Sequence, residues 1–285
     1  MNFEQYLQTK QFSPHTIASY CKGEAVFSGW LRQQQIAGEE AIYTDVLAFM
    51  RHLQDIGRSK RTVHFQMNIV RHYFACLISQ GRREDNPAAG VYVRGIVRKL
   101  PGNLLTMDEL EELYRCYQLQ LNVDRAKKLM LGLLIYQGLQ TEELMRLEAV
   151  HIQLKEGKIF IKGTSYSNER WLPLQAHQVV ELQQYLAVHR LREGPLLAPP
   201  VRSNASPKSL HNRMQHMIVQ LRKLNPKVIN ANQLRNSVLT FWLQRYNLRQ
   251  VQYMAGHKYI SSTERYQRLN KDDLQSELQK HHPMS

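Results

Sequence analysis

Residues 152–174, IQLKEGKIFIKGTSYSNERWLPL, interrupt a pattern that is helical along most of the chain. Their apolar residues fall into three short runs, at 152–154, 159–161 and 171–174, with glycine and polar residues between them. Runs of this length and spacing are typical of short strands joined by turns. The stretch therefore predicts a small three-stranded antiparallel sheet within a mainly α-helical fold.

Helical patterns lie on both sides of this sheet. Residues 129–136 are almost all apolar, which predicts a buried helix, and Gly138 is placed to end it. The sequence TMDE at 106–109 is a capping box, whose Thr and Glu side chains can satisfy the free backbone N–H groups at a helix start. After the sheet, helical spacing resumes at Ala176; Pro195, Pro199 and Pro200 mark a loop, and the remainder is helical to the C-terminus.

A separate set of helices is predicted in the first hundred residues. Ser13 and Pro14 combine a capping hydroxyl with a proline in the first helical turn. Further helical segments begin near Thr44 and Ser59, and Gly81 is placed to end the last of them. Each segment repeats apolar residues along one face, which is typical of a helical bundle.

The two helical blocks are separated by a basic segment that a Pro-Gly pair breaks, VRKLPGN at 97–103. Such a segment is typical of an exposed interdomain linker. The sequence therefore predicts an N-terminal helical domain over residues 1–97, a linker over 98–104, and a second domain over 105–285 that contains the sheet.

Composition excludes several classes of protein. The chain has 285 residues, of which 43% are hydrophobic, and no apolar run approaches the length of a membrane span. Its start lacks the basic residues and apolar run of a secretory signal. The cysteines Cys21, Cys76 and Cys116 are scattered without a C-x-x-C spacing, which favours a reducing compartment. We expect a cytoplasmic, nucleoid-associated protein with no membrane partner.

Positive charge is in excess and unevenly distributed. Thirty-eight Lys and Arg against twenty-four Asp and Glu give a net charge of +14, which indicates a polyanionic partner without distinguishing DNA from RNA or a membrane surface. Residues 194–263 contain no Asp or Glu, and we interpret them as a phosphate-binding surface. The basic residues of this acid-free segment are Arg202, Lys208, Arg213, Arg222, Lys223, Lys227, Arg235, Arg245, Arg249 and Lys258.

Known cofactor motifs do not occur in the sequence. It has no P-loop, no G-x-G-x-x-G, no H-E-x-x-H and no cluster of acidic metal ligands. The acid-free segment also counts against a two-metal nuclease, which needs several carboxylates. We therefore expect no cofactor and no metal.

Five short motifs follow one another in the second half of the chain: GLQTEEL at 138–144, KG at 162–163 with ERWLPL at 169–174, NQLR at 232–235, AGH at 255–257, and STERY at 262–266. In this order and spacing they resemble the tyrosine recombinase (phage-integrase) family, in particular its compact Xer-like or transposon-type members. Residues 13–20 and 82–87 resemble its N-terminal core-binding domain, a SAM-like set of helices that clamps DNA. One such fragment is weak evidence, whereas five in order are specific.

The resemblance implies a site-specific recombinase or integrase that cuts one DNA strand through a 3′-phosphotyrosyl link and rejoins it to another strand. Tyr266 matches the family's nucleophile, and Arg235 matches an arginine that binds the phosphate oxygens. Lys162 matches the general acid that protonates the leaving oxygen, and His257 matches a hydrogen-bond donor to the phosphate. Glu143 matches an acidic position that orients basic side chains. Each residue taken alone has an ordinary structural explanation, and the assignment rests on their joint spacing.

Two catalytic positions depart from the family pattern. Gln140 stands where the family has an arginine, and Asn232 stands where it has histidine or lysine. Losing one transition-state donor costs about 2.7–4 kcal/mol. Three interpretations are open. Another basic residue, such as Arg146 or Arg213, reaches the phosphate instead, or the reaction runs slowly. In the third, the chain binds and bridges DNA without cutting it. A non-cleaving DNA-binding or synapsis factor is therefore the alternative function, and a basic helical transcription regulator is a weaker one.

The resemblance also implies the partners. We expect double-stranded DNA with paired recombination sites, bound by a homotetramer that is a monomer when free. Residues 272–278 have the pattern of a short amphipathic helix. In the family such a helix docks onto a neighbouring protomer; the alternative is that it packs on its own domain. The sequence does not distinguish chromosome-dimer resolution from movement of a mobile element.

The substitution Gln140→Arg tests the first departure. If no other residue replaces the family's arginine, restoring the guanidinium stabilises the charge of the transition state and speeds cleavage by about a hundredfold. Single-turnover cleavage of site DNA measures the effect. An unchanged or lower rate means that another cation already occupies the phosphate-facing position.

Overall fold

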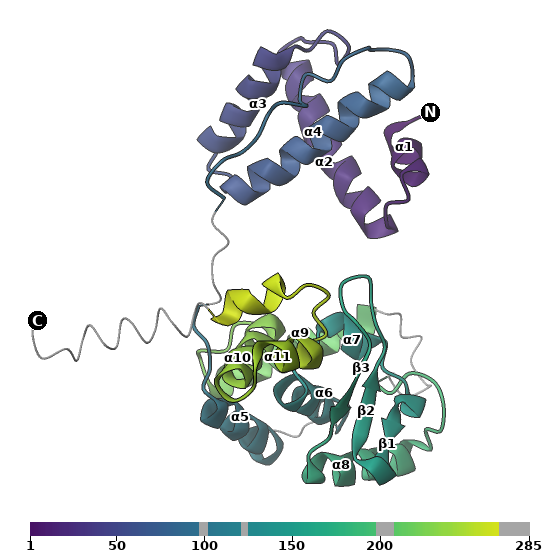
Figure 1. Ribbon diagram of the computed structural model, residues 1–285, viewed down its shortest axis with the longest axis vertical. Coiled ribbons are helices and arrows are strands. Elements are labelled where there is room, and N and C mark those ends of the chain that lie inside the picture. Colours follow the sequence, from purple (N-terminus) through teal and green to yellow (C-terminus); the bar gives the residue numbers. More distant parts are fainter. Residues whose placement is uncertain (97–101, 121–124, 198–207, 268–285) are drawn as a thin grey trace, which may run out of the picture. The chain divides into compact units, whose positions relative to one another are not determined.

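The computed structural model describes residues 1–96, 102–120, 125–197 and 208–267 (Figure 1). Its contacts divide the chain into two units, residues 1–98 and 99–285. The predicted linker over 98–104 lies largely outside the described residues, and the predicted helix over 272–278 lies entirely outside them.

The first unit is helical, as the sequence predicts. Ser13 and Ser59 accept hydrogen bonds of 3.2 Å from the backbone N–H groups of Thr16 and Thr62, so both predicted caps are present. The first helix was not predicted; a capping box starts it, and it buries only two side chains. The four helices are α1 (Phe3–Thr9), α2 (Pro14–Gln33), α3 (Tyr43–Asp55) and α4 (Lys60–Ser79).

Aromatic rings fill the core of this unit. Phe27 on α2 lies 4.9 Å from Phe49 on α3 and 5.8 Å from Phe74 on α4, measured between ring centroids. All three side chains are fully buried. The apolar stripes that the sequence shows on these helices therefore form the hydrophobic core, as in a helical bundle.

The second unit combines eight α-helical segments, two short 3₁₀ turns and one sheet within its described residues. The three strands are antiparallel in the order β1-β2-β3, and Ile159 pairs with Leu172 across the hairpin. The predicted fold class, mainly α with a small three-stranded antiparallel sheet, is confirmed. The elements are α5 (Met107–Gln120), α6 (Arg125–Tyr136), α7 (Thr141–Met145), β1 (Ile152–Gln153), β2 (Lys158–Ile161), β3 (Arg170–Pro173), α8 (Ala176–His189), α9 (Lys208–Leu224), α10 (Ala231–Arg245) and α11 (Leu248–Ala255). A further helical segment over residues 261–267 carries Tyr266.

Two interior helices position the site. Helix α6 is buried almost all round, as its apolar sequence predicts, and Gly138 follows it with a left-handed backbone of φ 56°. Helix α10 packs against α5, α6 and α11 (Figure 1). Because α10 is enclosed on these sides, polar residues in its first two turns, including Arg235 and Asn236, are buried.

None of the helices in the described part of the chain combines the length and the hydropathy that crossing a membrane requires.

Candidate active site

A pocket of about 670 Å³ opens in the second unit. Its walls come from the start of α7, the loop between β2 and β3, the start of α10 and the segment after α11. Five of the seven residues that the sequence singles out line it: Gln140, Asn232, Arg235, His257 and Tyr266. Segments that are more than a hundred residues apart in the sequence thus meet around one cavity.

Tyr266 is held by its hydroxyl group at the wall of this pocket. The side chain is 5% exposed, and its Oη donates a 2.8 Å hydrogen bond to Oδ1 of Asn236. Nη2 of Arg265 lies 3.4 Å from the same oxygen. The sequence analysis did not identify Asn236, which belongs to none of the motifs. The only signal for it in the sequence is that it directly follows Arg235.

Arg235 brings a buried positive charge to the pocket. It is 4% exposed and donates to the backbone carbonyls of Gly138 and of Ala255, the latter at 2.7 Å. Burial lowers the pKa of Arg235 to about 10, although Glu143 acts in the opposite direction. The guanidinium is therefore still charged at neutral pH.

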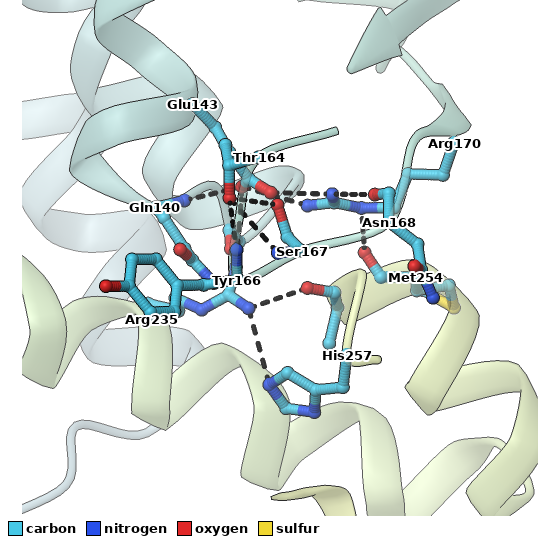
Figure 2. Close-up of polar contacts among 12 residues, drawn as sticks. Gln140, Glu143, Thr164, Tyr166, Ser167, Asn168, Arg170, Arg235, Met254 and His257 are labelled. Atoms are coloured by element: carbon cyan, nitrogen blue, oxygen red, sulfur yellow. Dashed lines mark hydrogen bonds and ion pairs between the residues drawn. The ribbon is translucent and has the colours of Figure 1, made fainter. Parts of the chain in front are cut away.

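Glu143 is the counter-ion for two buried guanidinium groups (Figure 2). Its two oxygens accept hydrogen bonds of 2.7 and 3.0 Å from Arg170, and one of them lies 3.8 Å from Nη1 of Arg235. Burial alone would raise the pKa of Glu143, but Arg170, the backbone N–H of Gln140 and the charge of Arg235 hold that pKa below its usual range. The carboxylate is therefore ionised and orients both cations.

Arg170 is a site residue that the sequence analysis did not single out. It is 2% exposed, and its Nε donates a 2.7 Å hydrogen bond to the carbonyl of Met254 at the end of α11. The signal for it was strand alternation: Arg170 and Leu172 share the buried face of β3, where a lone charged residue needs a partner.

His257 is neutral at physiological pH. Burial, followed by the positive charges of Arg235, Arg170 and Arg265, lowers the pKa of His257 to about 4. Its Nε2 lies 3.5 Å from Nη2 of Arg235 (Figure 2). Its Nδ1 lies 2.8 Å from the hydroxyl of Thr263. Because a guanidinium can only donate, the contact with Arg235 makes Nε2 an acceptor and puts the ring proton on Nδ1, toward Thr263. Donation from Nε2 to a phosphate requires the other tautomer, in which the Thr263 hydroxyl donates to Nδ1.

Gly256 lets the histidine segment approach the hairpin loop. It ends α11 with φ 70°, and its carbonyl accepts a 2.9 Å hydrogen bond from the backbone N–H of Asn168. Ser167 pairs with His257 as an isolated β-bridge. A Cβ at Gly256 would lie 2.8 Å from Cζ of Arg170, so only glycine fits both the backbone conformation and the space.

Lys162 is not part of the pocket wall. It is exposed at the end of β2, and the loop that follows it contributes Ser165 and Tyr166 to the lining. Its predicted role as general acid stays a prediction.

The bases expected to replace the missing guanidinium also lie elsewhere. Arg146 forms a 2.7 Å ion pair with Glu142, and neither Arg146 nor Arg213 is among the pocket-lining residues in the described part of the chain. Arg265 and Lys258, which the sequence analysis did not name as candidates, do line it.

Comparison with known proteins gives the family. The model of the phage integrase family matches residues 103–273, and that of the phage integrase N-terminal SAM-like domain matches residues 1–81. A tyrosine recombinase XerC of Oceanobacillus iheyensis is 26% identical over 294 residues, covering 99% of this chain and 94% of the relative.

Two solved structures share the fold. XerH site-specific recombinase bound to its difH substrate superposes with a TM-score of 0.69 at 16% identity, covering 96% of this chain and 84% of that one. A lambda integrase tetramer bound to a Holliday junction superposes with a TM-score of 0.68 at 15% identity, covering 93% of this chain and 74% of that one.

A tyrosine and a buried arginine in one pocket of an integrase-like helical fold define a class, the DNA strand transferases that work through a tyrosine. The chain belongs to the phage integrase family, and it is a site-specific recombinase of the tyrosine type. The resemblance stated from the motifs is confirmed, and the comparisons give the non-cleaving alternative no better support.

The substitution Glu143→Gln removes the counter-ion of two buried guanidinium groups. Breaking a buried ion pair on one side costs roughly 3–5 kcal/mol of unfolding free energy. Because the folded pKa of Glu143 lies below the unfolded value near 4.5, this stabilisation is complete above that pH and is lost as the pH falls through the folded pKa. Urea unfolding at pH 7 and at pH 3 measures the free energy of unfolding of wild type and variant. The difference between the two free energies is expected to be smaller at pH 3.

The matched control is Glu142→Gln, which affects an exposed ion pair with Arg146 and costs less than about 1 kcal/mol. Equal effects of the two substitutions, or a difference that does not change with pH, would contradict the role of Glu143.

Gly256→Ala tests the close approach beside Arg170. The left-handed backbone alone costs roughly 1–2 kcal/mol with any side chain other than hydrogen, and the new methyl group also displaces Arg170. Gly157→Ala is the control, because Gly157 has a similar φ of 61° and open space around it. Thermal unfolding is expected to show the larger loss at Gly256, and equal losses would refute the steric argument.

Proposed function

We propose that this chain cuts and rejoins duplex DNA with Tyr266 as its nucleophile. The phenolic oxygen bonds to the scissile phosphorus as the bond from phosphorus to the 5′ oxygen breaks, and the phenolic proton passes to solvent. A 5′-hydroxyl of another strand then reverses the exchange. One phosphodiester bond is replaced by another at each step, so the proposed reaction needs no ATP.

The observation that carries this proposal is the pairing of Tyr266 with Arg235 through one helix. Asn236 accepts the hydrogen bond of the Tyr266 hydroxyl, and the preceding residue on α10 is Arg235. The same two turns of helix therefore position the nucleophile and a cation for the phosphate. Preorganised charge of this kind is the largest contribution to catalysis in many enzymes.

The remaining roles follow from the pocket wall. Neutral His257 donates through Nε2 to a phosphate oxygen, and Gln140 and Asn232 supply uncharged amide donors. Glu143 acts through Arg235 and positions it. Lys162, on the hairpin that borders the pocket, gives its proton to the leaving 5′ oxygen.

We propose paired duplex sites as the substrate and a homotetramer as the active assembly. The acid-free segment, whose Arg235 and Lys258 line the pocket, supports a phosphate-rich partner. XerH bound to its difH substrate and the lambda integrase tetramer on a Holliday junction show how two structural neighbours engage DNA. The nucleoid is the proposed place of action, because the substrate lies there.

Covalent trapping tests the nucleophile. Duplexes that the protein retains from a random-sequence library are nicked one to three nucleotides from each phosphate in turn, so that the short leaving strand diffuses away after cleavage. Wild type is expected to form a covalent adduct with one of these nicked duplexes. In Tyr266→Phe the adduct disappears while DNA retention is unchanged, because only the attacking oxygen is lost.

Tyr246→Phe is the control, since Tyr246 is exposed and lies outside this pocket. An adduct that survives in Tyr266→Phe and is lost in Tyr259→Phe would assign the nucleophile to the neighbouring exposed tyrosine of the pocket. Tight retention of DNA with no adduct by wild type would establish the non-cleaving factor instead.

A further inference from the structure

The buried side chains at the pocket carry too little positive charge for the proposed reaction. Glu143 carries one negative charge, and Arg170 and Arg235 carry one positive charge each, so the buried group has a net charge of +1. A phosphodiester already carries one negative charge, and a second develops as the tyrosine oxygen attacks. Gln140 and Asn232 contribute only dipoles, and the proton of Lys162 goes to the leaving 5′ oxygen, so the non-bridging phosphate oxygens need one further cation.

Arg265, the residue before the nucleophile, lies in the wall of the same pocket. Its Nη2 is 3.4 Å from Oη of Tyr266, and its Cζ is 5.3 Å from the centroid of that ring. Its Nε is buried and has no hydrogen-bond partner among the residues that the structure describes. A buried N–H without a partner is costly, so a ligand oxygen that accepts its hydrogen bond is bound favourably.

We infer that Arg265 binds the scissile phosphate and takes the place of the guanidinium that Gln140 lacks. This inference rests on the proposed strand-cutting function. The cation is supplied from the residue beside the nucleophile instead of from the start of α7. Its Nε–H and a terminal N–H form the two-pronged donor that suits non-bridging phosphate oxygens.

The other bases near the pocket fit this role less well. Lys258 lines the pocket but is exposed, so solvent screens its charge. Arg146 does not line the pocket, and its charge is paired with Glu142, which does.

The electrostatics of His257 agree with this placement. The charge of Arg265 is one of the causes that lower the pKa of that histidine, after burial, Arg235 and Arg170. The guanidinium of Arg265 therefore acts on the interior of the pocket and not only on its rim.

Single-turnover cleavage of the trapped duplex, at saturating protein, tests the inference. Arg265→Gln is expected to slow adduct formation about a hundred- to a thousandfold. Arg265→Lys restores part of the rate, because it keeps the charge and loses the fork. Arg115→Gln, which removes the same charge from the exposed face of α5, is the control and leaves the rate unchanged.

A second substitution shows whether the two positions serve one role. In the Arg265→Gln background, Gln140→Arg is expected to raise the rate at least about tenfold, whereas in wild type it changes the rate less than about threefold. Replacing the scissile phosphate by an uncharged methylphosphonate should bring wild type and Arg265→Gln to within about tenfold, since the charge that Arg265 binds is gone. A purely structural role for Arg265 would leave the ratio of the two rates unchanged by this substitution.

The outcomes separate the inference from the proposed function. Equal cleavage by wild type and Arg265→Gln overturns the inference and leaves the function intact, whereas no adduct with wild type overturns the function. In that second case, inorganic phosphate is titrated into protein with ¹⁵N-labelled arginine. Phosphate that shifts the buried Nε–H signal of Arg265 in wild type, but not the signal of Arg115, supports phosphate binding at Arg265, and an unmoved signal overturns it.

Discussion

The ionised carboxylate of Glu143 between two buried arginines is the interaction on which the catalytic unit depends. Removing three charges from water is costly unless each is paired and hydrogen-bonded. Arg170 meets this condition through Glu143 and the carbonyl of Met254, and Arg235 meets it through the carbonyls of Gly138 and Ala255. These bonds join α7, β3, α10 and the end of α11. The same contacts therefore close the fold and aim a guanidinium at the pocket.

This arrangement leaves the pocket with a neutral histidine and two amides for the reaction we propose. Cations already buried beside His257 hold its pKa far below neutral, so the ring serves as a hydrogen-bond group and not as a third cation. Net charge at the phosphate must then come from side chains at the pocket wall. Arg265 stands there with a buried N–H that has no partner in the described part of the chain. In the reaction we propose, Arg265 therefore supplies a charge that Gln140 and Asn232 lack.

Local signals in the sequence predicted most elements correctly, because caps, turns and apolar periodicity act over a few residues. Ser13, Ser59 and Thr106 begin helices as expected, and the runs around Ile159 and Leu172 pair as strands. Helix α1 escaped prediction because it is short and buries only two side chains. Motif spacing also placed Arg235, His257 and Tyr266 in one site. Neither Arg170 nor Asn236 could be found this way, since neither stands at a motif position that was assigned a role; their contacts with Glu143 and Tyr266 are set by chain packing.

By itself the sequence determined the family, the helical fold with its small sheet, and five of the residues that line one pocket. Only the tertiary structure decided which cations reach that pocket. It placed Arg146 in an exposed ion pair, left Lys162 exposed at the end of β2, and brought Arg265 beside the tyrosine hydroxyl. The physical reason is that the sequence specifies the charge of each side chain but not its surroundings. The effect of that charge on a phosphate depends on distance, burial and counter-ions, which chain packing sets.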